Sequence, residues 1–428
     1  MRLPAYFCGA ALAGFAASLW LHPAPPALGD FGDWTYEAVL LRDLLLGHGH
    51  AGYWLKQYPV PNSFNTVVMA LFGLVLPWKA AAKLYLCLQL AIGFVASLAL
   101  FAAARSRRPG LRSTLWFVVP GAVFLGVNFW YGFMNFQVGV AWAMLVCALL
   151  LMGSEGIVLF SFLLTLTFFT HMIPCAFACL AVLLYARQYR RWRILWSLLP
   201  VAILSGAYIV GRFVYAHNAD AQAAIDTKIR YLSGAFFAFK VNTFLKSFGF
   251  VNPSSNLDTS VALRLFGDKI FLVLFLLNAL LAAIFLYLIV RRVTECFRTR
   301  CPQSFLWWTF LIFVLLYAVA PGKGLGVSDP GARLLQTALW IALFLVADSE
   351  WLMRIAAVCG LCLLAANFVL FNTLATAPPQ AGAEQTKLPP FIAHFGHMPY
   401  EDKTQYYDDL ARGRFNEDIF PTGLFLKR

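Results

Sequence analysis

Apolar runs long enough to cross a lipid bilayer recur along most of this chain. A membrane-spanning helix needs roughly 20 consecutive apolar residues, and such runs follow one another from Leu3 to Thr373. Hydrophobic residues make up 61% of the chain and charged residues only 12%, which excludes a soluble multidomain protein. The runs lack the alternation of transmembrane β-strands. The pattern therefore predicts an all-α polytopic membrane protein.

Three short arginine-rich loops set the predicted orientation. They begin at Arg105, Arg187 and Arg291, and such loops stay on the cytoplasmic side of a membrane. This rule accounts for the formal charge of +13 without nucleic acid as a partner. All three loops lie inside only when residues 64–76 form a short interfacial helix and residues 80–104 alone cross the membrane.

About eleven spans follow from this orientation, with the C-terminus outside. We expect the first run to remain as a helix rather than to be cleaved as a signal peptide. The expected spans are Leu3–Leu21, Ala80–Ala104, Leu115–Asn128, Phe136–Met152, Ile157–Thr170, Pro174–Ala186, Ile194–Phe213, Lys269–Val290, Phe305–Ala320, Leu334–Ala347 and Ile355–Thr373.

The orientation divides the chain into a transmembrane domain, 1–374, and an extracytoplasmic tail, 375–428. The outer side also receives a first loop, 22–63, and a second loop, 214–268. All seven histidines fall on this side or at its edge, and the cytoplasmic loops hold no comparable cluster. Any chemistry is therefore expected on the outer face, and an envelope with an outward-facing site fits the inner membrane of a bacterium.

Cysteine usage predicts no disulfide framework. Most of the nine cysteines lie inside apolar runs, while Cys296 and Cys301 fall in an arginine-rich loop that we place in the cytoplasm. Cys359 and Cys362 have CxxC spacing within a hydrophobic helix, where packing of small residues is the preferred interpretation over a redox or zinc site.

Acidic residues directly after the first span are the main catalytic candidates. Asp30 and Asp33 precede an amphipathic stretch, Trp34–Leu46, and Glu37 shares a helical face with Asp33. A carboxylate at the membrane surface can act as a general base or as a metal ligand. It can also cap a helix N-terminus, and Asp33 fits that role, which makes Asp30 the stronger catalytic candidate.

Histidines supply further candidates for substrate binding. His48 and His50 lie in the first outer loop, where they bind a metal or phosphate or simply belong to a polar loop. His171 separates two hydrophobic runs near the outer face. It either caps a helix or orients a phosphate.

A glycine-rich outer segment, 321–332, runs into a predicted span that begins beside Arg333. Its spacing is not that of a P-loop, but glycine permits close backbone approach, and Lys323 and Arg333 can hold a phosphate. Asp329 lies in the same segment. Arg333 is placed to meet a lipid phosphate, with ordinary snorkelling as the alternative. The basic, aromatic loop 214–268 suits anionic membrane lipids or plain surface adhesion.

These features together resemble the GT-C superfamily of integral membrane glycosyltransferases, which includes protein O-mannosyltransferases and the aminoarabinose transferase of lipid A. The acidic residues after the first span match at Asp30 and Asp33, and a late basic outer residue matches at Arg333 or Lys323. The turn Tyr58-Pro59-Val60-Pro61 resembles the His-Pro-Pro-Leu motif of some members, but it lacks the histidine and the adjacent proline pair.

The resemblance implies a transferase that takes sugar from a polyprenyl-phosphate carrier. An acidic residue would activate a lipid or glycan acceptor, the lipid phosphate would leave, and some members use a divalent metal ion. Other interpretations of the same pattern are a lipid or glycan flippase, a transporter, an envelope polysaccharide polymerase or ligase, and a structural subunit. The near absence of ionisable residues inside the spans speaks against an ion-coupled transporter.

Overall fold

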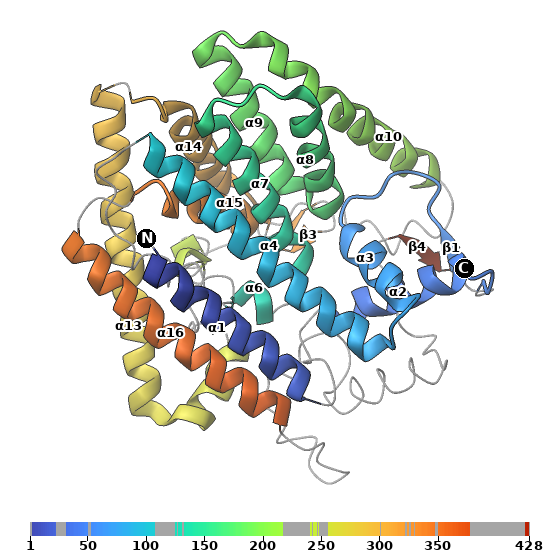
Figure 1. Ribbon diagram of the computed structural model, residues 1–428, viewed down its shortest axis with the longest axis horizontal. Helices are drawn as coiled ribbons and strands as arrows, with labels where there is room; N and C mark the ends of the chain where they lie inside the picture. Colours follow the sequence, from blue (N-terminus) through green and yellow to red (C-terminus); the bar gives the residue numbers. More distant parts are fainter. Residues whose placement is uncertain are drawn as a thin grey trace.

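The computed structural model is mainly helical (Figure 1). It describes residues 2–22, 31–49, 53–107, 125, 127–130, 132–216, 240–241, 243–245, 247, 256–299, 301–321, 323–324, 327–328, 330–346, 350–376 and 424–427. Within these ranges, six helices are long and apolar enough to cross a membrane, and shorter apolar helices accompany them. The polytopic α-helical membrane character expected from the sequence is therefore confirmed.

The helices and strands follow the hydropathy pattern closely. They are α1 (Arg2–Leu21), α2 (Phe31–Leu45), β1 (Tyr53–Leu55), α3 (Phe64–Gly73), α4 (Trp78–Ser106), α6 (Val127–Trp130), α7 (Met134–Met152), α8 (Ile157–Thr170), α9 (Met172–Tyr189), η2 (Trp192–Leu198), α10 (Leu199–Ala216), α13 (Asn256–Thr299), α14 (Ser304–Val319), β2 (Lys323–Gly324), β3 (Val327–Ser328), α15 (Pro330–Leu343), α16 (Glu350–Thr376) and β4 (Phe425–Lys427).

The division expected between residues 64–76 and 80–104 is present. Helix α3 has 10 residues and is therefore about 15 Å long, half of the roughly 30 Å that a bilayer core requires. Helix α4 has 29 residues and follows after Pro77. The total of about eleven spans stays a prediction, because most of Leu115–Asn128 lies outside the described residues and α8 and α15 have only 14 residues each.

Helix α2 begins earlier than the sequence pattern indicates. Its first residue is Phe31, so Asp33 lies within the first turn, and the expected capping position for Asp33 is wrong. The physical reason is that Phe31 is fully buried and stacks on Tyr85 of α4, with ring centroids 6.4 Å apart. Because this contact holds Phe31 in the helix, α2 begins two residues before Asp33.

Helix α13 extends the span expected at Lys269–Val290 in both directions. Its 44 residues change direction at Gly267, which has φ 71°, a value that glycine adopts without a steric penalty. The end of the expected loop 214–268 is therefore helical from Asn256 onward.

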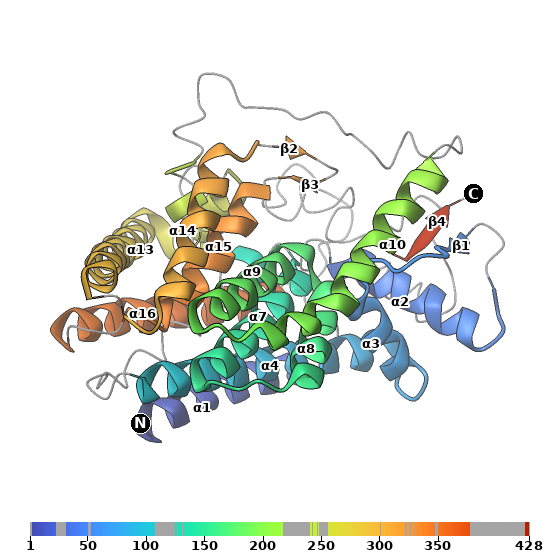
Figure 2. The ribbon, with the colours of Figure 1, turned by 90° about the horizontal axis from the view of Figure 1, so that it is seen from above.

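Helix α7 lies in the middle of the bundle. Of its membrane-length window, 83% is buried, whereas only 17% of the window Trp192–Gly211 is buried. Figures 1 and 2 show α4, α8 and α9 around α7. Helices α1 and α16 run side by side (Figure 1), and they are joined where Ser18 Oγ donates to Asn372 Oδ1.

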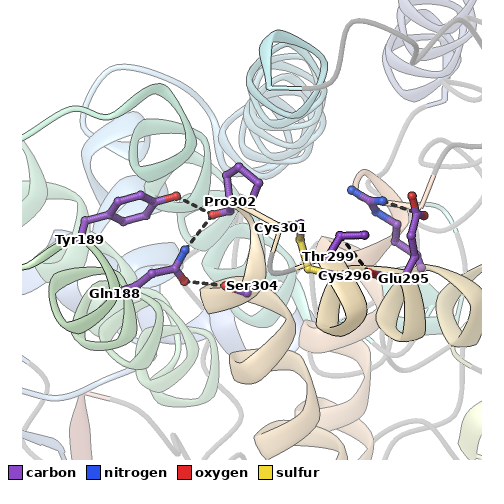
Figure 3. Close-up of a disulfide and its surroundings, with 9 residues drawn as sticks. Gln188, Tyr189, Glu295, Cys296, Thr299, Cys301, Pro302 and Ser304 are labelled. Atoms are coloured by element: carbon purple, nitrogen blue, oxygen red, sulfur yellow. Dashed lines mark hydrogen bonds and ion pairs between the residues drawn. A yellow bond between two sulfur atoms is a disulfide. The ribbon is translucent and has the colours of Figure 1, made fainter.

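The corner between α13 and α14 contains a disulfide bond between Cys296 and Cys301 (Figure 3). The absence of disulfides expected from the sequence is therefore wrong here. The reason is local geometry: the turn after α13 brings the two Cα atoms to 4.9 Å, within the range that a disulfide requires. Beside this bond, Pro302 O accepts hydrogen bonds from Tyr189 Oη at 2.6 Å and Gln188 Nε2 at 3.2 Å, at the end of α9.

Two small antiparallel sheets accompany the helices. Strands β2 and β3 form a hairpin in the glycine-rich segment before α15. Strand β4, the end of the expected tail, pairs with β1 of the first loop, and Figure 2 shows the two strands together beside α2 and α10. The segment 401–418, which the sequence pattern indicates as a solvated helix, lies outside the described residues.

Candidate site around the first turn of α7

The first turn of α7 and the residue before it contact four other parts of the bundle. Asn135 faces α3, Phe136 faces the break between α8 and α9, and Gln137 faces α4. Phe133, directly before the helix, faces α15. Because these residues are neighbours in sequence, they bring elements far apart in the chain to one place. We refer to this region, Phe133–Gln137 and its partners, as the α7 junction.

On one side the α7 junction is joined to the first loop through α3. Asn135 Nδ2 donates to Asn62 O at 2.7 Å, and Asn135 Oδ1 accepts from Asn65 N at 3.2 Å. The next residue, Thr66, donates to Glu37 Oε2 at 3.3 Å. Glu37, a predicted substrate-binding residue, is only 1% exposed. Its carboxylate is thus linked to α7 through α3, where Thr66 contacts Glu37 and the neighbouring Asn65 contacts Asn135.

On another side Arg333 lies against the α7 junction. Its guanidinium stacks over the ring of Phe133, with 4.5 Å from Cζ to the ring centroid, a cation–π geometry. Arg333 belongs to the first turn of α15. Three residues later, Gln336 Oε1 accepts from Asn128 Nδ2 at 3.0 Å, and both side chains are buried. The late arginine expected to meet a phosphate is therefore fixed beside a membrane-spanning helix.

His171 occupies the break between α8 and α9 and caps α9. Its Nδ1 accepts a hydrogen bond from Ile173 N at 3.2 Å, which leaves Nε2 as the ring's donor. The imidazole meets Phe136 edge to face, with centroids 5.3 Å apart. Burial, followed by the charge of nearby Arg333, lowers the pKa of His171 well below its ordinary value. His171 is therefore a neutral, directional group near the arginine.

Lys240, one of the basic residues for which the loop 214–268 was expected to suit anionic lipids, is a further cation near α15. Its Nζ donates to Tyr317 O at 2.6 Å and Ala320 O at 2.9 Å, at the end of α14. A Cβ atom on Gly331, in the first turn of α15, would lie only 2.9 Å from this Nζ. Glycine at that position leaves room for Lys240, whose flexible end would have to shift if a Cβ atom were present. A lysine in a basic loop gives no sequence signal of this contact, because it depends on how the loop returns to α14.

Neutral polar side chains join α3 and α7 to α4. Tyr85 Oη donates to Asn65 Oδ1, and Gln89 Nε2 donates to Gln137 Oε1. All four side chains are almost fully buried. Buried amides are costly to leave unpaired, so these contacts fix the relative placement of α3, α4 and α7 behind the candidate site.

Of the other predicted site residues, those that the structure describes lie in elements away from the α7 junction. His48 is exposed just beyond the end of α2, and Lys323 lies in strand β2. Asp33 lies in the first turn of α2. Asp30, His50 and Asp329 lie outside the described residues. Among the three groups that do converge, Glu37 approaches through α3, whereas His171 and Arg333 touch α7's first turn or the residue before it.

Within the described part of the chain, no group of three or more His, Cys, Asp and Glu side chains is arranged to hold a metal ion. Two of the expected acidic ligands, Asp30 and Asp329, fall outside that part.

No protein-family model, curated protein or solved structure matches this chain.

Proposed function

We propose that this protein is a membrane glycosyltransferase that moves a sugar from a polyprenyl-phosphate carrier to an envelope acceptor on the outer face of the membrane. One observation carries the proposal: the α7 junction brings Arg333 and neutral His171 together on a bundle of apolar helices, and α3 joins it to the acidic first loop. A fixed cation next to apolar spans is the arrangement that a lipid-linked phosphate requires.

The chemistry assigned to each group follows from charge. As the glycosidic bond to the carrier breaks, negative charge grows on the departing phosphate, and a preorganised cation stabilises it. Arg333 supplies this charge, and Lys240 lies beside the same turn of α15. His171 Nε2 offers a neutral donor. In the first loop, Asp30 or Asp33 would take the proton from the acceptor hydroxyl.

The proposal includes the predicted setting of the protein. The partners are a polyprenyl-phosphate-linked sugar, a lipid or glycan acceptor, and the surrounding membrane lipids. The first loop and the tail would face the periplasm of a bacterium, and the arginine-rich loops the cytoplasm.

The test is sugar transfer from a radiolabelled polyprenyl-phosphate-sugar mixture by the purified protein in lipid vesicles. Loss of a general base lowers rates by about 10²–10⁴-fold, so the Asp30→Asn/Asp33→Asn variant should lose nearly all transfer. Arg333→Gln should lower transfer at least tenfold, because the phosphate loses its charge partner. Arg193→Gln removes an exposed arginine from the predicted cytoplasmic side and should leave the rate unchanged.

Two outcomes would contradict the proposal. One is full transfer by both the aspartate variant and Arg333→Gln. The other is no transfer by the unaltered protein across several carriers, with and without divalent metal ions, which would favour transport or assembly.

A further inference from the structure

The last described residues of the chain lie on the first outer loop. Strand β4 pairs antiparallel with β1, so that Leu426 lies opposite Trp54 and Phe425 opposite Leu55. A further backbone bond of 2.8 Å joins Lys56 N to Leu424 O. Figure 2 shows β4 next to β1, whereas α16, the helix that precedes β4 in the sequence, lies on the other side of the view.

The strand is also held by a side chain of α2. Glu37 Oε2 accepts a hydrogen bond from Leu424 N at 3.4 Å, in addition to the one from Thr66. The carboxylate therefore lies beneath the first residue of the docked segment, and it is 1% exposed. A hydrogen bond from a backbone N–H to a carboxylate is stronger than one between two neutral groups. Glu37 thus gives the docked segment a charged contact with α2.

An apolar groove of about 400 Å³ lies next to this contact. Its lining comes from α2 and from β1 with its neighbours, and consists of Leu40, Leu44, Gly49, Tyr53, Trp54, Leu55, Lys56 and Gln57. Trp54 is 52% exposed and Leu55 42% exposed, even with β4 in place. The paired surface is therefore only partly covered by the strand.

We infer that β1 and Glu37 form a strand-binding surface whose occupant is the chain's own C-terminal strand, which docks reversibly. Each strand has three residues, and an isolated pair of this kind is marginal in water. Docking is favoured because the strand belongs to the same chain as β1, which makes its association intramolecular. A docked strand shields Glu37, and an undocked one exposes both the carboxylate and the backbone edge of β1.

The consequence for activity rests on the proposed function, whereas the docking does not. Glu37 belongs to the acidic loop that receives the acceptor, so the docked strand competes with the acceptor for that loop. Removing residues 424–428 should raise transfer several-fold at low acceptor concentration. If neither the full chain nor the shortened chain transfers sugar, the proposed function fails and the docking is decided by the physical tests alone.

The first physical test uses cysteine pairs. Opposed residues in an antiparallel pair have Cα atoms roughly 4.5–5.5 Å apart, which suits a disulfide. The Trp54→Cys/Leu426→Cys protein should yield the cross-linked peptide under mild oxidation, as read by mass spectrometry. The control, Tyr53→Cys/Phe425→Cys, is out of register by two residues and should not. Equal cross-linking of both pairs, or of neither, overturns the inference.

The second test uses hydrogen exchange in the full protein. Deleting residues 424–428 should speed exchange in the peptide 53–57, because Lys56 N loses its partner. Glu37→Gln should speed it partly, since the charge-assisted bond to Leu424 is weakened. Exchange in α14, 304–319, serves as the control and should not change. Unchanged exchange at 53–57 in the shortened chain would refute the docking.

Discussion

At the residue scale, His171 combines a structural role as a helix cap with a pKa that its surroundings lower. It caps α9 through an unprotonated Nδ1, and Gly139 of α7 approaches it so closely that a Cβ there would lie 3.2 Å from the His171 Cβ. Protonation would remove the cap and place a cation near Arg333. Burial, followed by the charge of Arg333, lowers the pKa of His171.

This arrangement makes stability depend on pH. The unfolded histidine titrates near 6.5, and the folded one at lower pH, so the unfolded state binds more protons below about 6.5. The stabilisation is therefore complete above about pH 6.5 and is lost as the pH falls further. In detergent, the melting temperature of the unaltered protein should drop between pH 7 and 5.

Variants of His171 separate capping from titration. His171→Asn retains an N-cap acceptor without titrating, so it should melt as the unaltered protein does at pH 7 and show a smaller drop at pH 5. His171→Ala should cost about 1 kcal/mol at pH 7 through the lost cap. An identical pH profile in His171→Asn would rule out this histidine as the source.

Single residues also show where prediction from the sequence ends. Asp33 and His171 were singled out because carboxylates and histidines are rare in an apolar chain. Thr66 was not, and Lys240 stood out only as one of several cations in the loop 214–268, because threonine and lysine are unremarkable in an interfacial helix or a loop. Their roles arise from contacts with Glu37 and with the end of α14, which no local pattern encodes.

At the scale of elements, hydropathy predicts most helix boundaries to within a few residues. Ile157–Thr170 was predicted with the bounds that α8 has. The sequence does not predict which helices touch, because all of them are apolar. Which helices pack together is decided by a few hydrogen bonds between buried amides, such as that of Gln89 with Gln137. Tight turns between helices, such as the one between α13 and α14, also contribute.

The disulfide at that corner should stabilise the hairpin of α13 and α14. Closing a loop with sequence separation 5 is worth about 2 kcal/mol in the chain-entropy description. We expect Cys296→Ser/Cys301→Ser to lower the melting temperature of the oxidised protein by several degrees, whereas reducing agent should lower that of the unaltered protein equally. Cys359→Ser/Cys362→Ser, at two free cysteines of α16, is the control and should remain sensitive to the reductant. A melting temperature that does not respond to reductant in the unaltered protein would contradict this.

At the scale of the whole molecule, the pairing of β1 with β4 constrains the path through the membrane. Both strands must lie on one side, so the chain between them crosses an even number of times. Nine of the described helices between them correspond to spans expected from the sequence, namely α4, α7, α8, α9, α10, α13, α14, α15 and α16. If all nine cross, a tenth crossing is required, and the expected span Leu115–Asn128 provides it.

Reporter tags test this count. A tag in the first loop after His48 and a tag after Arg428 should report the same side, and a tag beside Cys301 the opposite side. If the tag beside Cys301 is cytoplasmic, the Cys296–Cys301 disulfide should form only once the protein is removed from the reducing cytosol, and alkylation of intact cells should find both thiols reduced. Opposite sides for the first two tags would disprove both the even count and the strand pairing.

The difference in burial between α7 and α10 determines which parts of this sequence can change during evolution. The window Trp192–Gly211, which includes most of α10, is little buried within the bundle, so one apolar residue there can replace another with little effect. Every side chain of α7 that touches a neighbour must also fit its volume. Related chains should therefore be recognised by the sequence of α7, while α10 retains only its hydrophobicity.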